Sequence, residues 1–131
     1  MPRKVHTFQI LGEPASKANS RKIVTMRGKP VSIKSDKARN YVKTFSQQCE
    51  KLDELFTSDV CVEMLIYYAS RRPDLDESLI LDCMQGYVYE NDRQVKQKNI
   101  YWALDRDSPR TVVRVSPLET GDIPSYLRCL P

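Results

Sequence analysis

Residues 71–82, RRPDLDESLILD, set two arginines and a proline directly before four carboxylates, Asp74, Asp76, Glu77 and Asp82. Asp74 and Asp76 are two residues apart, where an apolar segment gives way to helical spacing. If both side chains point to one side, their oxygens can share a divalent cation such as Mg²⁺, which prefers oxygen ligands and keeps several waters. Without a cation, adjacent carboxylates repel, and one of them tends to hold a proton. The alternative interpretation is that Asp74 or Asp76 caps a helix and stabilises its positive end.

The segments on either side predict how these carboxylates are positioned. Residues 59–69, DVCVEMLIYYA, are the most apolar and β-prone part of the chain and predict a central strand. Both faces of this strand are largely apolar, which is typical of a strand that is covered on both sides. The apolar residues that follow recur at three- and four-residue steps and predict a short second helix, closed by Gly86: they are Leu75, Leu79, Ile80, Cys83 and Met84.

The remaining segments predict a mixed sheet with two main helices. Expected strands span residues 5–11, 94–104 and 111–116, and a hairpin around Gly28 joins residues 22–26 to residues 30–34. Ser35 can cap a helix that begins at Asp36, with an apolar stripe at Ala38, Val42, Phe45, Cys49, Leu52 and Phe56. This order indicates one compact α+β (α/β) domain over residues 1–116. The proline-containing residues 117–131 are expected to form a C-terminal extension.

The charges are distributed unevenly along the chain. Residues 1–45 hold eleven Lys or Arg and two acids, a balance of +9, which leaves −5 of the total +4 for the remainder. Residues 74–92 hold six acids and no Lys or Arg. A basic half joined to an acidic segment suits a polyanion-binding surface with a cation site in its middle.

Several classes of protein are disfavoured by composition. The four cysteines form no C-x-x-C pair, so neither a disulfide framework nor a zinc site is expected. His6 is the single histidine and lies in an alternating segment, which favours strand packing over catalysis. No apolar run approaches the roughly 20 residues that span a bilayer, and the first residues lack the pattern of a signal peptide. A cytoplasmic protein without membrane contact is therefore expected.

Two segments together resemble the Holliday-junction resolvases of the RusA type. Residues 71–84, RRPDLDESLILDCM, followed by residues 87–95, YVYENDRQV, resemble the family's D-L-D helix start and the later aspartate before Gln-Val. Residues 14–24 and 29–41 are similar to the family's N-terminal loop, hairpin and helix start, so the resemblance covers roughly residues 5–116. It implies a small homodimeric α/β nuclease that needs Mg²⁺, or Mn²⁺ in its place, and cuts four-way DNA junctions in recombination and repair.

The resemblance also implies roles for individual residues. Asp74, Asp76 and Asp92 match the family's catalytic, metal-binding carboxylates. A two-fold-symmetric cut on two strands calls for two sites, which fits a homodimer. For DNA contact we expect the basic and polar side chains of the loop and those beside the carboxylates, since arginine forks suit phosphate oxygens: they are Lys17, Asn19, Arg21, Lys22, Arg71 and Arg72.

The chain departs from the family pattern at two positions. Glu77 stands where the family has asparagine, and Ile80 stands where it has a helix lysine that suits charge developing at a phosphate. Lys96 and Lys98 are the candidates to replace that lysine. The alternatives are a nuclease for other branched DNA, a junction-binding protein with weak or no cutting activity, and a basic module that binds RNA.

Overall fold

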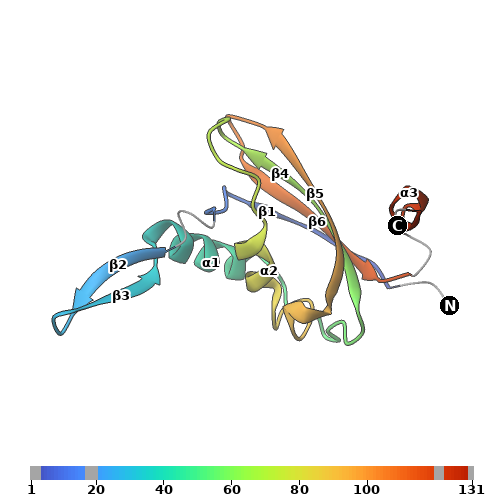
Figure 1. Cartoon of the computed structure of the whole chain (residues 1–131), viewed down its shortest axis with the longest axis horizontal. Coiled ribbons are helices and arrows are strands. Elements are labelled where there is room, and N and C mark those ends of the chain that lie inside the picture. Colours follow the sequence, from blue (N-terminus) through green and yellow to red (C-terminus); the bar gives the residue numbers. More distant parts are fainter. Residues whose placement is uncertain (1–3, 17–20, 120–122, 130–131) are drawn as a thin grey trace.

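Four strands form a mixed sheet around the apolar segment at residues 59–69. In the computed structural model, which describes residues 4–16, 21–119 and 123–129, the strand order is β1-β6-β4-β5. The strands are β1 (His6–Leu11), β4 (Val60–Tyr68), β5 (Val95–Leu104) and β6 (Arg110–Pro117). β4 is antiparallel to β6 and parallel to β5, so the expected central strand and mixed sheet are confirmed (Figure 1).

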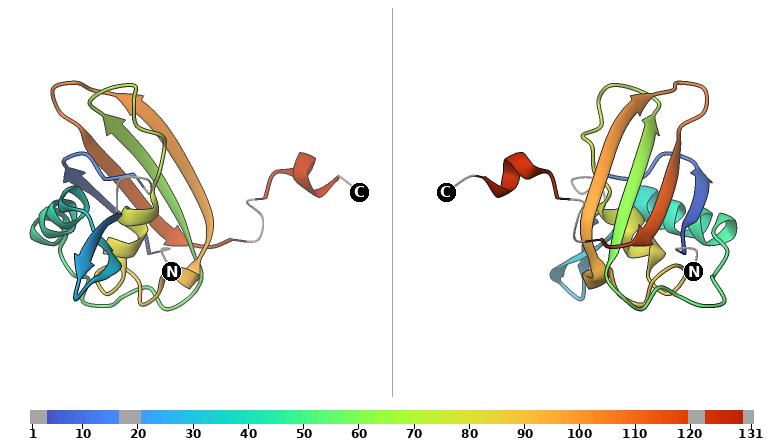
Figure 2. Two further views of the ribbon diagram at one scale, coloured as in Figure 1. Left: turned by 60° about the vertical axis from the view of Figure 1, so that its left-hand side comes forward. Right: turned by 90° about the vertical axis from the view of Figure 1, so that its right-hand side faces the viewer.

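The parallel pair β4 and β5 needs a crossover connection, and that crossover carries the carboxylates. It consists of residues 69–77, the helix α2 (Ser78–Met84), a loop and the 3₁₀ helix η2 (Asp92–Gln94). The longer helix α1 (Asp36–Gln48) lies with α2 on one face of the sheet (Figure 2). α3 (Ser125–Arg128) is a short C-terminal helix whose residues are all exposed.

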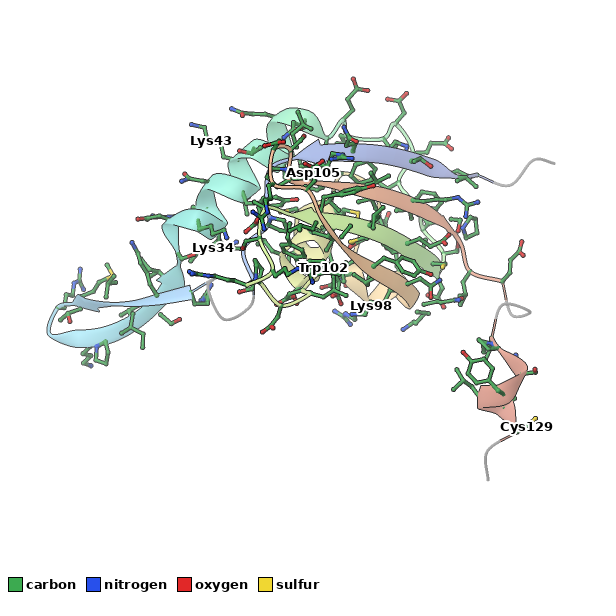
Figure 3. All side chains as sticks on the ribbon, turned by 90° about the horizontal axis from the view of Figure 1, so that it is seen from above. Lys34, Lys43, Lys98, Trp102, Asp105 and Cys129 are labelled. Atoms are coloured by element: carbon green, nitrogen blue, oxygen red, sulfur yellow. The ribbon has the colours of Figure 1, made fainter. Side chains whose placement is uncertain are left out.

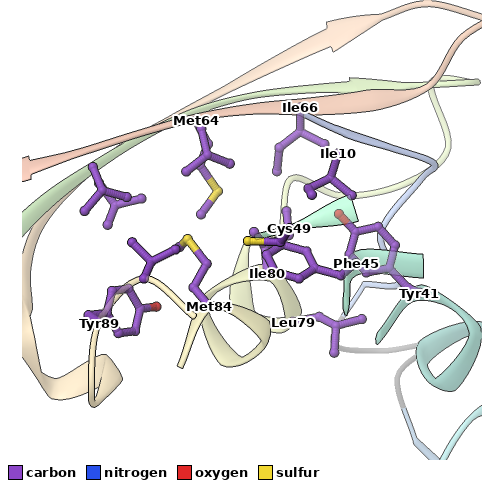
Figure 4. Packing of buried hydrophobic residues seen from close by; sticks show 14 of the residues in the cluster. Ile10, Tyr41, Phe45, Cys49, Met64, Ile66, Leu79, Ile80, Met84 and Tyr89 are labelled. Atoms are coloured by element: carbon purple, nitrogen blue, oxygen red, sulfur yellow. The ribbon is translucent and has the colours of Figure 1, made fainter. Parts of the chain in front are cut away.

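The core lies between this face of the sheet and the two main helices. On β4 the residues Val60, Val62, Met64, Ile66 and Tyr68 are at most 2% exposed. Side chains from α1 and α2 pack against them, namely Ala38, Tyr41, Phe45, Leu79, Ile80 and Met84. Figure 4 shows Ile80 and Met84 pointing toward the side of the sheet that carries Met64 and Ile66.

The hairpin formed by β2 (Arg21–Met26) and β3 (Lys29–Lys34) is a separate two-stranded sheet that projects from the domain (Figure 1). Its turn residues Arg27 and Gly28 have φ of 53° and 76°. Positive φ at both central residues is what a tight hairpin turn requires, so the hairpin expected around Gly28 is confirmed.

The helix ends differ from expectation in two places. Ser35 caps α1 as expected, with its hydroxyl accepting from the Ala38 N–H at 3.2 Å. The helix stops at Gln48 instead of continuing to Phe56, because residues 52 and 56 donate their N–H groups to carbonyls of Tyr87 and Val88. Leu75 is 40% exposed in the crossover loop, so, contrary to expectation, it does not belong to the buried face of α2. The end of α2 before Gly86 agrees with the prediction.

The outer face of the sheet is covered by no helix within the described residues. Leu65 and Val112 are half-buried there, and Tyr101 is 58% exposed. These side chains surround a shallow hollow of about 180 Å³, next to the ion pair between Glu63 and Arg114. The composition of β4 predicted a strand covered on both faces. Within the described residues of a single chain, only one of its faces is covered by helices.

Across the parts of the chain that the structure describes, no helix has the length and apolar character needed to cross a membrane.

Candidate active site

Asp76 lies immediately before α2 and shapes the start of that helix. Its Oδ1 accepts from the Ser78 N–H at 2.9 Å and from the Ser78 hydroxyl at 2.6 Å. The formal cap residue Glu77 makes no side-chain cap hydrogen bond. The capping contacts that the alternative interpretation predicted are therefore present. They do not exclude cation binding, because an ionised carboxylate offers about four acceptor positions.

Tyr68, the last residue of β4, connects Asp76 to the sheet. Its hydroxyl oxygen accepts from the Asp76 N–H at 3.2 Å, and its ring stacks on Trp102 with the centroids 6.1 Å apart. Burial is the largest cause that raises the pKa of Tyr68; the Asp76 N–H opposes it, and the charges of Asp76, Glu13 and Glu77 add to it. The buried ring thus fixes the backbone of Asp76 and lies amid three carboxylates.

Glu13 belongs to the cluster of carboxylates around Tyr68, which also contains Asp76 and Glu77. The sequence alone did not single it out. Its Oε2 accepts from the Ala69 N–H at 2.8 Å, and its Oε1 lies 3.2 Å from the Lys37 Nζ. It thereby ties the N-terminal loop and α1 to the first residue after β4. The one available signal was that Glu13 is one of two acids in the basic first 45 residues.

Glu77 faces a cation from the neighbouring strand. Its Oε1 lies 2.6 Å from the Nζ of Lys98, a β5 residue that pairs with Val62 of β4. Figure 3 shows Lys98 and Trp102. The two residues are an even number of positions apart in β5, so their side chains lie on the same side of the strand. The guanidinium of Arg71 lies 5.9 Å from the centre of the Trp102 ring. Lys98 and Trp102 of β5 therefore contact Glu77 and Arg71 of the crossover, respectively.

Asp92 lies at the other end of α2. Its N–H donates to Gln85 Oε1 at 2.9 Å. Burial, followed by the charge of Asp92, raises the pKa of Asp82, while Lys34 lowers it. Asp82 is thus the electrostatic neighbour of Asp92.

The donor chemistry of Asp74 and Asp76 suits Mg²⁺, but a three-residue site is not assembled. Asp74 is exposed and Asp76 is half-buried in the same loop. Within residues 4–16, 21–119 and 123–129, no group of three or more His, Cys, Asp or Glu is placed to hold a metal ion. Mg²⁺ commonly uses one or two carboxylates together with substrate phosphates. Metal binding by Asp74 and Asp76 stays a prediction.

The residues expected to contact DNA occupy two regions. Arg21 and Lys22 begin β2 instead of lying in a loop, and Lys22 Nζ is 3.1 Å from Asp36 Oδ1. Arg71 and Arg72 are exposed beside the aspartates. Lys17 and Asn19 lie outside the described residues.

The thiols and the imidazole have structural surroundings. Burial raises the pKa values of Cys49 and Cys83 to about 11, which disfavours the nucleophilic thiolate. His6 stacks on Phe8 with a centroid separation of 5.2 Å, and burial lowers its pKa. The carboxylate cluster is thus the better candidate for chemistry.

Acidic side chains at a strand-to-helix crossover, flanked by arginines and a basic hairpin, define a candidate nuclease. The family model described as Endodeoxyribonuclease RusA matches residues 12–116, so the chain belongs to this family of Holliday-junction-resolving endonucleases. The match includes β2 to β6 and both main helices. No curated protein matches the chain.

Proposed function

We propose that the protein is a Mg²⁺-dependent endonuclease that resolves four-way DNA junctions during recombination and repair. The observation that carries this proposal is the family match over residues 12–116, which spans the crossover with Asp74 and Asp76. Paired nicks in a four-way junction, with little cutting of a replication fork or a flap at equal concentration, test it. Preferred cutting of the fork or flap would favour a nuclease for other branched DNA. Competition by duplex RNA would favour the RNA-binding alternative.

The chain's own groups have separable roles in the proposed reaction. Asp74 and Asp76 hold the cation, and Tyr68 keeps Asp76 in place through its backbone N–H. Arg71 and Arg72 bind phosphate oxygens and orient the strand for in-line attack by water. When bound, Mg²⁺ supplies charge neutralisation at the phosphate and favours deprotonation of water. Mn²⁺ is expected to substitute. The part of Asp92 as a further ligand rests on its match to the family's third carboxylate.

We propose further that the hairpin β2–β3 binds a duplex arm of the junction. Residues 21–34 contain five Lys or Arg and no acid, and Ile23 is 75% exposed on this ribbon. A two-stranded ribbon fits the major groove of B-DNA. In addition to the DNA contacts expected at Arg21 and Lys22, Arg27 and Lys29 of the same hairpin are expected to contact this duplex arm.

A charge-neutralising variant of the hairpin tests this surface. Arg27→Asn with Lys29→Gln is expected to reduce the slope of log K against log salt by about 2 for junction binding, because each lost phosphate contact removes about 0.9. Asparagine is chosen because it tolerates the positive φ of residue 27. The matched control changes exposed Lys51 and Arg106 to glutamine. An equal slope change in both variants would contradict the assignment to the hairpin.

The outer face of the sheet is the proposed homodimer surface. Leu65, Val112 and Tyr101 present apolar area there, and a two-fold contact would bring this face against its own copy. Light scattering is expected to give about twice the chain mass of 15.2 kDa for the wild type. Tyr101→Arg is expected to give monomers, whereas Ile23→Arg on the hairpin should leave the dimer intact. A monomeric wild type would refute the dimer, and a dimeric Tyr101→Arg would refute this surface.

A further inference from the structure

The part of the crossover that runs from Asp74 to Asp92 lacks an internal cation. Residues 74–92 hold six acids and no Lys or Arg, and α2 itself reads SLILDCM. Cleavage of a phosphodiester develops negative charge at the phosphate and at the leaving oxygen, and positive groups aimed at this charge are usually the largest catalytic contribution. Apart from Arg71 and Arg72, which precede the aspartates, a basic side chain at this part of the site must come from another element.

Position 80 does not have room for that charge. Ile80 is 0% exposed and packs in the core between α2 and the sheet, so its side chain points away from solvent and from any bound DNA. A cation in this place would be desolvated without a partner, which strongly disfavours it. The α2 face that carries Ile80 is thus buried in the hydrophobic core.

β5 supplies a cation instead. Lys98 lies on the parallel neighbour of β4, and its Nζ is 2.6 Å from Oε1 of Glu77, the residue after Asp76. The Lys98 side chain is 48% exposed, while that of Glu77 is 16% exposed. The ammonium group is therefore held at Glu77, the residue that follows Asp76, and is still accessible from solvent.

The ion pair is not needed for folding on energetic grounds. An ion pair with one partner half-exposed contributes little to the stability of the fold. Lysine is a compact point charge on a flexible stem, so it can leave a carboxylate for a phosphate oxygen only a few ångströms away. Glu77 would then act as the docking group for Lys98 when DNA is absent.

We propose that Lys98 is a catalytic residue that contacts the scissile phosphate and stabilises the charge developing there, and that Glu77 holds Lys98 only while DNA is absent. This inference rests on the proposed nuclease function. Lys98 takes no proton from water in this assignment; it acts as a fixed positive charge.

Single-turnover cleavage of a four-way junction by saturating enzyme tests the proposal, with junction affinity measured separately in EDTA. Lys98→Met is expected to slow cleavage by about 10²-fold, as removal of one charge-stabilising donor typically does, and to change affinity less than about 3-fold. Lys98→Arg should recover most of the rate, because it keeps the cation. Glu77→Gln should keep most of the rate, because Lys98 is still present. The control Lys96→Met removes an exposed cation from the same strand and should cut normally.

The outcomes separate this proposal from the proposed function. If the wild type makes no cuts, the nuclease function fails. If the wild type cuts and Lys98→Met cuts at the same rate, only the role of Lys98 fails. Equal losses in Lys98→Met and Glu77→Gln would show that the pair merely holds the loop, which also overturns the proposal. Melting curves identify any variant that fails to fold.

Discussion

Asp76→Asn is expected to reduce junction cleavage by at least about 10²–10³-fold, the loss typical of removing a group that stabilises the reacting charge. Asparagine keeps a side-chain oxygen that can still accept from Ser78, so the start of α2 is preserved. It lacks the negative charge that a cation needs. The variant should therefore bind junctions normally and remain folded while failing to cut them.

The measurement combines single-turnover cleavage, a gel-shift affinity in EDTA and a melting curve. Asp107→Asn makes the same chemical change at an exposed residue in the turn between β5 and β6, and it should cut at the wild-type rate. Retention of cleavage by Asp76→Asn would contradict the metal-binding role of this residue. Full cleavage with an unchanged melting temperature would instead support the pure capping interpretation, because asparagine caps a helix about as well as aspartate.

Ile80→Lys is expected to destabilise the protein by more than about 4 kcal/mol, because it removes a buried aliphatic group and buries an unpaired charge. Domains of this kind have total stabilities of only about 5–15 kcal/mol. Ile80 is 0% exposed, so the substituted ammonium has no route to water that leaves the core packing intact. The variant that restores the lysine of the resembled family should therefore lose activity through unfolding.

Urea unfolding measures this effect. The matched control is Ile23→Lys, the same change at a side chain that is 75% exposed, which should alter stability by less than about 0.5 kcal/mol. A folded Ile80→Lys protein with wild-type stability and faster cleavage would contradict the description of position 80 and would weaken the case for Lys98.

The local signals in the sequence were sufficient for most of the fold. Ser35 before an apolar stripe predicted the start of α1, and the apolar, β-prone character of residues 59–69 predicted β4 as the central strand. The end of α1 was predicted wrongly because Leu52 and Phe56 keep helical spacing although their backbone pairs with residues 87 and 88. That pairing is a tertiary contact, and spacing along the chain contains no information about it.

The site was predictable only in part for a similar reason. Asp74 and Asp76 were visible as a close pair beside a strand end, which is a local pattern. Glu13 joins them from a segment more than 50 residues away through its bond to the Ala69 N–H. Lys98 could be named as a candidate, but its contact with Glu77 depends on the parallel register of β4 and β5.

Cleavage of an end-labelled four-way junction by the wild-type protein, in Mg²⁺, Mn²⁺ or EDTA, tests the central claim most directly. Paired symmetric nicks that require either metal and vanish in EDTA are the predicted result. Tight binding of the junction without nicks in either metal would contradict it and would identify a junction-binding protein that lacks cutting activity.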